Sequence, residues 1–253
     1  METPRAGRIA LVGSGEYLPV MHDIEQWLLA DRPARYVQLA TAAAPEGDRV
    51  LEKWHRLGAE AAERLGVEQV VVDIRTRADA DDPEHAEAIA GAGLIYLSGG
   101  NPRHLARTLA GTRTWAAILA EWRAGASLAG CSAGAMALGG YVPDIRHPSK
   151  GGTEGLGAVP DLRVIPHFDR YSRFIPDAVM RPLISAGKVV VGIDEDTALL
   201  SSGPGRAEGD DDAAGDHDAD VWEFRSRGVG SAWTIEHDRR HRVNAPLRLR
   251  VAT

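Results

Sequence analysis

Residues 130–134 place a serine between two glycines, in the order Gly-Cys-Ser-Ala-Gly. The pattern Gly-x-Ser-x-Gly is typical of a nucleophile elbow, a tight turn between a strand and a helix that leaves the serine hydroxyl exposed. Glycines on both sides let the two elements approach each other closely. An apolar run precedes the segment, as a buried strand requires. Ser132 is therefore the candidate nucleophile of an acyl-transfer reaction.

A serine hydroxyl is a weak nucleophile unless a base accepts its proton, and histidine is the usual base near neutral pH. Among nine histidines, His167 stands out because the apolar residues 164–166 precede it, which places it at the end of an expected strand. A carboxylate must then orient the imidazole. Segment 192–197 offers Glu195, which we favour, and Asp194 as the alternative. The chain order of serine, histidine and acid predicts a serine hydrolase.

Acyl transfer also needs backbone N–H groups that stabilise the oxyanion, each worth roughly 10²–10³ in rate. Gly100 and Ala133 are the candidates for these donors. In open α/β sheets, ligands bind beyond the carboxyl ends of the strands. Both the glycine pair at 99–100 and Ser132 are expected at that edge, so they support one shared active site.

The elements that must position these residues alternate along the first half of the chain. Between two of the expected strands, apolar residues recur every three or four positions, and Gly66 is expected to end that helix with a positive φ. Strands that alternate with helices predict a parallel sheet covered on both faces, a three-layer α/β/α sandwich. The strand candidates are Ile9 to Val12, Tyr36 to Leu39, Gln69 to Ile74 and Leu94 to Leu97.

In the last quarter of the chain, strands no longer alternate with helices. Two runs there are expected to be adjacent strands, and three later runs predict short antiparallel strands that the C-terminus of the chain adds to a mostly parallel sheet. The adjacent strands are 188–193 and 197–200, and the additions are 221–224, 232–235 and 247–251.

Composition limits the broad class of the protein. With 253 residues, of which 44% are hydrophobic and 26% charged, the chain is expected to form one α/β domain over 1–253. The net charge of −7 comes largely from seven acids between Glu208 and Asp220. We predict that 203–220 is a flexible acidic loop, because this composition buries too little apolar surface to order itself.

Several sequence patterns that indicate the location or the partners of a protein are absent. The single cysteine excludes a disulfide within the chain and fits a reducing compartment. No segment has the pattern of a signal peptide or of a membrane span, so we expect a cytoplasmic protein. No basic region typical of nucleic-acid binding is present, and neither a nucleic acid nor a membrane is an expected partner.

The motifs together resemble the cyanophycinase and aspartyl dipeptidase (dipeptidase E) family of serine peptidases. The resemblance spans roughly residues 8–200 and rests on five segments: Gly-Ser-Gly-Glu at 13–16, Gly-Gly-Asn at 99–101, Gly-Cys-Ser-Ala-Gly-Ala at 130–135, Pro-His-Phe at 166–168 and Gly-Ile-Asp-Glu-Asp-Thr-Ala at 192–198. It implies a fold like that of class I glutamine amidotransferases. It also implies Ser132 as nucleophile, His167 as base and Glu195 as orienting acid, in hydrolysis beside aspartyl residues without a metal or another cofactor.

The substrate branch stays open. The chain beyond residue 200 resembles the cyanophycinase branch, which cleaves a β-aspartyl-arginine isopeptide, but cyanophycinases usually have Gln at the position of Pro102. Arg170 and Arg173 are candidates to bind a substrate carboxylate bidentately, and Asn101 is a further substrate-binding candidate. The expected partner is a small aspartyl peptide with an α or a β linkage. A homodimer, common in this architecture, is left open.

Two other functions are alternatives. An esterase of the α/β-hydrolase type shares the elbow but places the acid before the histidine, so His237 or His241 would be its base. A non-catalytic binding protein on the same fold is the second. We interpret Cys131 as a small buried residue, because the glycines flank Ser132 symmetrically rather than the cysteine. The aspartates at 210–212, 216 and 218 lack the ligand spacing of a calcium loop.

Overall fold

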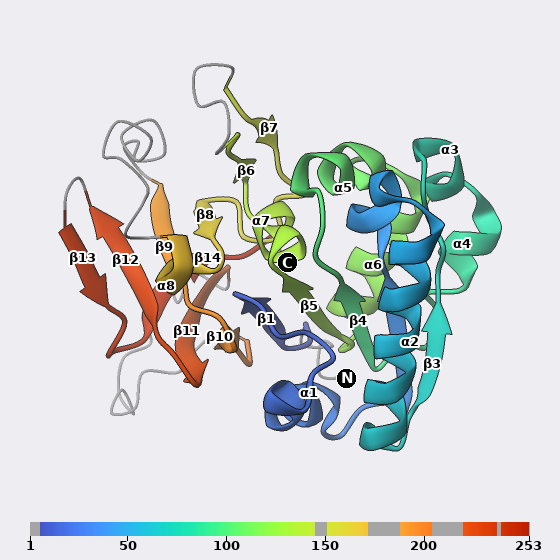
Figure 1. Cartoon of the computed structure of the whole chain (residues 1–253), viewed down its shortest axis with the longest axis horizontal. Coiled ribbons are helices and arrows are strands. Elements are labelled where there is room, and N and C mark those ends of the chain that lie inside the picture. Colours follow the sequence, from blue (N-terminus) through green and yellow to red (C-terminus); the bar gives the residue numbers. More distant parts are fainter. Residues whose placement is uncertain (1–5, 145–150, 172–187, 204–219, 237–238, 253) are drawn as a thin grey trace.

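The computed structural model describes residues 6–144, 151–171, 188–203, 220–236 and 239–252 (Figure 1). The largest element is an eight-stranded sheet, followed by a four-stranded sheet and a two-stranded ribbon. In spatial order the large sheet contains β14 (Leu247–Arg250), β11 (Val221–Gly228), β10 (Thr197–Ser201), β1 (Ile9–Val12), β5 (Ser127–Cys131), β4 (Leu94–Leu97), β2 (Arg35–Leu39) and β3 (Glu68–Val71). The smaller sheet contains β13 (Arg239–Arg242), β12 (Ala232–Glu236), β9 (Val189–Ile193) and β8 (Leu162–Ile165), and the ribbon pairs β6 (Tyr141–Val142) with β7 (Thr153–Glu154).

Helices connect the strands and cover the large sheet. They are α1 (His22–Leu29), α2 (Asp48–Leu65), α3 (Arg77–Ala80), α4 (Pro83–Glu87), α5 (Pro102–Leu109), α6 (Arg113–Arg123), α7 (Ala133–Leu138) and α8 (Phe168–Tyr171), with 3₁₀ turns η1 (Pro19–Met21) and η2 (Thr41–Glu46). None of the helices in the described ranges is long and apolar enough to cross a membrane.

The strand directions confirm the predicted fold class. The five strands β1, β5, β4, β2 and β3 run parallel to one another, whereas β10, β11 and β14 extend the sheet beyond β1 in antiparallel fashion. Parallel strands place their carboxyl ends at one edge, so the residues that follow β1, β4 and β5 gather there. The predicted helix before β3 is α2, and Gly66 ends it in the left-handed conformation with φ 67°.

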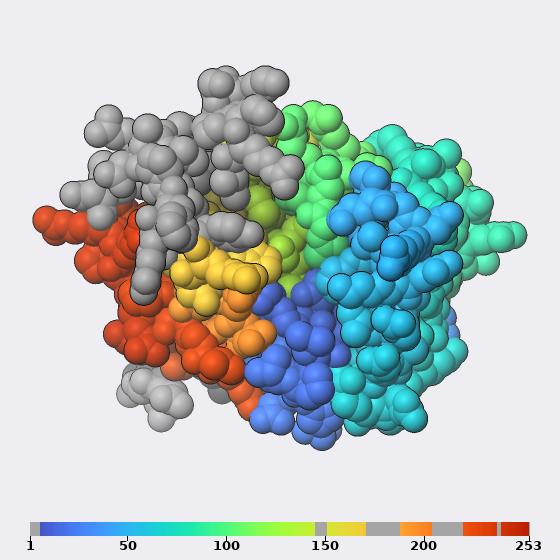
Figure 2. Space-filling view, viewed as in Figure 1, coloured from blue at the N-terminus to red at the C-terminus, as the bar shows by residue number. Residues whose placement is uncertain are grey.

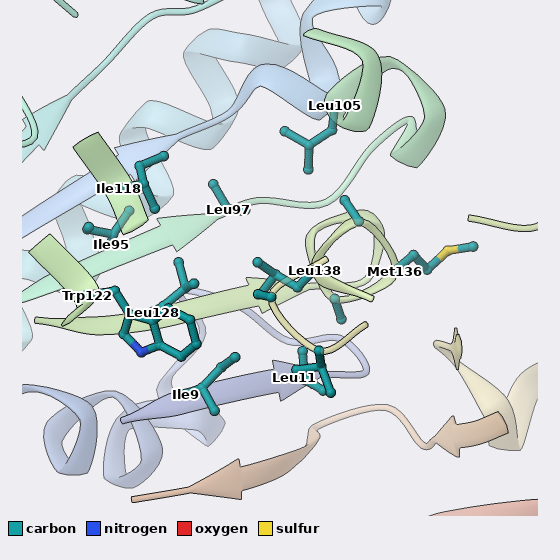
Figure 3. Packing of buried hydrophobic residues seen from close by; sticks show 14 of the residues in the cluster. Ile9, Leu11, Ile95, Leu97, Leu105, Ile118, Trp122, Leu128, Met136 and Leu138 are labelled. Carbon is teal, nitrogen blue, oxygen red and sulfur yellow. The ribbon is translucent and has the colours of Figure 1, made fainter. Parts of the chain in front are cut away.

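Alternate residues of each central strand face opposite helical layers, as a sheet buried on both faces requires. On one face, side chains of β1, β4 and β5 pack against α5, α6 and α7, with Trp122 fully buried among them (Figure 3). On the other face, α1 and α2 cover the alternate positions of the same strands (Figure 1). These two layers bury the central strands completely and hold their ends rigid.

Two expectations about the strands need correction, and one further strand was not expected. The runs at 188–193 and 197–200 form β9 and β10, but these strands are not hydrogen-bonded neighbours. β9 pairs with β8 and β12, while β10 pairs with β1 and β11, because the turn at 194–196 directs the chain from one sheet into the other. β3 ends at Val71 rather than at Ile74, and β13 forms from a fully exposed run of charged residues that no apolar pattern indicated.

Glu25 is a buried acid of α1, only 1% exposed, and its Oε1 accepts the Tyr17 N–H at 3.1 Å. Burial raises the pKa of this carboxyl from 4.5 to about 7, against the lowering effects of the Tyr17 hydrogen bond and of nearby Arg64. A raised folded-state pKa means that the native protein binds the proton more tightly than the unfolded chain. The stability that this proton contributes is complete below pH 4.5 and is lost as the pH rises through about 7.

Glu25→Gln mimics the protonated carboxyl and should remove this pH dependence. We expect the variant to exceed the wild type in unfolding free energy by up to about 3 kcal/mol at pH 8, with a much smaller difference at pH 5. Urea unfolding of both proteins at the two pH values measures this change. An equal difference at pH 5 and pH 8 would contradict the assignment.

Candidate active site

The turn at Ser132 joins the end of β5 to the start of α7 in a conformation that few residues adopt. Ser132 has φ 48° and ψ −103°, and its neighbours on both sides are fully buried. A Cβ on Gly130 would lie 2.5 Å from the Gly134 carbonyl carbon, and one on Gly134 would lie 2.2 Å from the Leu97 carbonyl oxygen. The two glycines of the motif therefore permit the close packing of strand and helix that fixes the serine.

Ser132, His167 and Glu195 lie in one chain of hydrogen bonds. Ser132 Oγ is 3.1 Å from His167 Nε2, and His167 Nδ1 is 2.8 Å from Glu195 Oε1. The carboxylate favours the tautomer with the proton on Nδ1, so Nε2 is unprotonated and can accept the serine proton. Each residue follows the end of a strand, β5, β8 and β9 respectively. In Figure 2 the yellow residues after β8 lie beside the light-green segment of α7 and the blue segment after β1.

Asp194, the alternative acid, has a different set of contacts. It is 8% exposed, and its carboxylate accepts the Ser231 N–H at 2.9 Å and the Trp233 indole N–H at 3.1 Å. It therefore ties the turn after β9 to β12. Glu195 is the acid that contacts His167, and its own N–H donates to Asp169 Oδ1 at 2.9 Å.

The two predicted oxyanion donors are held in place by different constraints. Ala133 is the first residue of α7, where backbone N–H groups have no acceptor within the helix. Gly100 has φ 136°, and a Cβ there would lie 2.5 Å from the Ala42 carbonyl carbon, so only glycine fits. The Asn101 N–H donates to the Ala42 carbonyl at 2.7 Å and holds this loop against η2. Their role as oxyanion donors stays a prediction.

The predicted substrate-binding residues have contacts of their own within the protein. Asn101 caps α5, because its Oδ1 accepts the N–H groups of Arg103 and His104 at 3.1 Å each. Arg170 Nη1 lies 3.3 Å from Glu195 Oε1, beside the hydrogen-bonded chain. Their contact with substrate stays a prediction. Arg173 and most of the expected acidic loop at 203–220 lie outside the described residues.

Glu16 is a residue of this region that the sequence analysis did not select. It is 6% exposed and contacts both Gly99 and Cys131, the residues that precede Gly100 and Ser132. The available signal was its place in the Gly-Ser-Gly-Glu segment after β1. Within the ranges that the structure describes, no group of three or more His, Cys, Asp or Glu side chains is placed to hold a metal ion.

Comparison with known proteins assigns the family. A model of peptidase family S51 matches residues 11–207, which include the elbow, His167 and Glu195. The chain belongs to peptidase family S51. It is therefore a serine-type peptidase, and the predicted resemblance is confirmed. The esterase alternative gains no support, since the base that contacts Ser132 is His167 and His241 lies in the exposed β13. His237 lies outside the described residues.

Curated relatives of this S51 peptidase are cyanophycinases. The protein from Trichormus variabilis is 27% identical over 221 residues, which cover 79% of this chain and 70% of the relative. That from Geminocystis herdmanii is 28% identical over 169 residues, which cover 61% of this chain and 57% of the relative.

Solved structures agree with the fold. A peptidase from an acI-B1 Actinobacterium superimposes with a TM-score of 0.81 at 36% identity and covers 98% of both chains. A putative peptidase E protein from Listeria monocytogenes superimposes with a TM-score of 0.58 at 16% identity, which covers 89% of this chain and 100% of the other and shows the shared fold.

The packing of Gly134 against β4 leads to a prediction. Gly134→Ala places a methyl group against the Leu97 carbonyl, so α7 must shift, and we expect a loss of about 1–3 kcal/mol in unfolding free energy. Gly58→Ala is the comparison, because Gly58 is also a buried helical glycine but its methyl group would meet the end of the Gln38 side chain rather than backbone, and that amide can shift only at the cost of its hydrogen bonds to Trp54 and Gln69. Thermal unfolding of both variants measures the difference. A Gly134→Ala protein as stable as wild type would contradict the close packing of the elbow.

Proposed function

We propose that Ser132, His167 and Glu195 are the catalytic triad of a peptidase that hydrolyses small aspartyl peptides or β-aspartyl isopeptides. The observation that carries the proposal is the hydrogen-bonded chain from Ser132 Oγ through His167 to Glu195 Oε1 at 3.1 and 2.8 Å. The strained elbow that presents the serine and the membership in a serine peptidase family support it.

The chemistry follows from the positions of these groups. His167 Nε2 accepts the Ser132 proton while Oγ attacks the substrate carbonyl, and Glu195 stabilises the resulting imidazolium. The N–H groups of Gly100 and Ala133 donate to the oxyanion of the tetrahedral intermediate. His167 then donates its proton to the leaving amine, which departs and leaves an acyl-enzyme on Ser132. Water, deprotonated by the same imidazole, hydrolyses this ester and releases the acid product.

Arg170 is the candidate to bind a substrate carboxylate beside the triad. Arg170 contacts Glu195 through one nitrogen only, and its side chain is 68% exposed. A guanidinium carries five N–H donors in a planar fork, so the remaining donors can bind a substrate carboxylate next to the scissile bond. The cyanophycinases among the relatives support the β-aspartyl isopeptide as the first candidate.

Hydrolysis of α-Asp-Leu and β-Asp-Arg by the wild type and by Ser132→Ala tests the proposal. We expect release of arginine from β-Asp-Arg by the wild type and at least a 10³-fold lower rate in the variant, because the nucleophile is lost. Release of leucine alone would assign the dipeptide branch instead. Cleavage of neither dipeptide, or equal rates in Ser132→Ala and wild type, would contradict the proposed function.

A further inference from the structure

Glu16 is a buried acid whose two oxygens each accept one hydrogen bond at the edge of the sheet. Oε1 accepts the Gly99 N–H at 2.9 Å, and Oε2 accepts the Cys131 S–H at 2.7 Å. Burial, together with the nearby carboxylate, raises the pKa of the Cys131 thiol well above its usual range, so the sulfur keeps the proton that it donates. An unpaired buried carboxylate would be costly, and these two donors offset that cost.

The two donors belong to the two segments that flank the nucleophile. Gly99 comes directly before Gly100 at the end of β4, and Cys131 comes directly before Ser132 at the end of β5. A Cβ on Gly99 would lie 2.8 Å from Glu16 Oε1 and 3.6 Å from Ser132 Cβ. Gly99 is thus packed between the carboxylate and the serine, and one side chain bridges the two segments just beyond the paired ends of β4 and β5.

The backbone that carries Glu16 is itself fixed to the turn of Glu195. The Gly13 N–H donates to the Thr197 carbonyl at 2.8 Å, and the Asp196 N–H donates to Ser14 Oγ at 3.3 Å. These two hydrogen bonds therefore restrict the movement of the segment that carries the Glu16 carboxylate. It connects the ends of β4 and β5 to a frame that already includes the third member of the proposed triad.

We propose that Glu16 is a positioning residue, which bridges Gly99 and Cys131 and so holds the Gly100 N–H at the distance from Ser132 Oγ that oxyanion binding requires. The inference rests on the proposed function, since it takes Ser132 as the nucleophile and Gly100 as an oxyanion donor. This role depends on the length of the Glu16 side chain, which must contact two donors in fixed positions. Its negative charge is assigned the smaller part, because the two groups that Glu16 contacts, the Gly99 N–H and the Cys131 S–H, are not members of the proposed triad.

Two substitutions separate the effect of side-chain length at Glu16 from the effect of its charge. Glu16→Asp keeps the charge but is one methylene shorter, so it cannot contact both Gly99 and Cys131. Glu16→Gln keeps the length: its oxygen accepts the Gly99 N–H, and its NH₂ group faces the Cys131 sulfur, a weak acceptor. Glu16→Ala removes the bridge altogether. Glu25→Gln is the matched control, because it neutralises a neighbouring buried acid that contacts neither Gly99 nor Cys131.

The measurement is the second-order rate of Ser132 labelling by a diphenyl phosphonate. In this reaction Ser132 Oγ forms a bond to phosphorus, phenoxide leaves, and the phosphoryl oxygen occupies the oxyanion site. The readout needs no aspartyl peptide, and the final labelling stoichiometry counts the folded sites in each variant. We expect Glu16→Asp and Glu16→Ala to label about 10- to 100-fold more slowly per site, because a displaced oxyanion donor loses most of its contribution. Glu16→Gln and Glu25→Gln should stay within about threefold of wild type.

The outcomes separate this inference from the function on which it rests. Wild-type rates in Glu16→Asp would overturn the positioning role and leave the triad standing. A Glu16→Gln protein as slow as Glu16→Asp would also overturn it, because charge rather than reach would then matter. Should Glu16→Ala fail to fold, the Asp and Gln variants decide the question. Absence of Ser132 labelling in the wild type would overturn the proposed nucleophile and this inference together.

Discussion

The turn at Ser132 is the constraint on which the rest of the site depends. A serine with positive φ costs of order 1–3 kcal/mol, and it persists only where the surrounding structure determines it. Here the constraint is the contact of α7 with the ends of β4 and β5, which the absence of side chains at Gly130 and Gly134 permits. The fully buried central strands supply the rigidity, so the stability of the sheet core maintains the strain at its edge.

The same kind of strain recurs around the site. Among the described residues other than glycine, five have positive φ: Tyr17, Asp31, Ser132, His167 and Asp196. All but Asp31 lie in the segments that hold or adjoin the proposed triad. His167 and Asp196 each follow a strand closely, and the turn at 194–196 sends the chain from the smaller sheet into the larger one. The site thus forms where two sheets meet, and the unusual backbone conformations are those that bring their strand ends together.

Local patterns in the sequence predicted the elements and the candidate residues. They carry no information on contacts between residues that are distant in the sequence. The elbow motif and the helix ending at Gly66 depend on neighbouring residues, so both were predictable. The separation of β9 and β10 into different sheets depends on pairing with β12 and β1, which no apolar period encodes. Glu16 was not predicted for a related reason. A single acid after a glycine-rich turn does not indicate that a backbone donor distant in the sequence, the Gly99 N–H, contacts it.

In the proposed triad Glu195 orients His167, while Asp194 only holds the turn. The most direct test compares kcat for β-Asp-Arg hydrolysis in Glu195→Gln and Asp194→Asn, with thermal unfolding of both. We expect Glu195→Gln to lose about 10²–10⁴-fold in kcat at a nearly unchanged melting temperature, because the imidazole takes the wrong tautomer. Asp194→Asn should unfold at a lower temperature and keep kcat within about tenfold of wild type. The opposite pattern, with kcat lost in Asp194→Asn and retained in Glu195→Gln, would contradict the account.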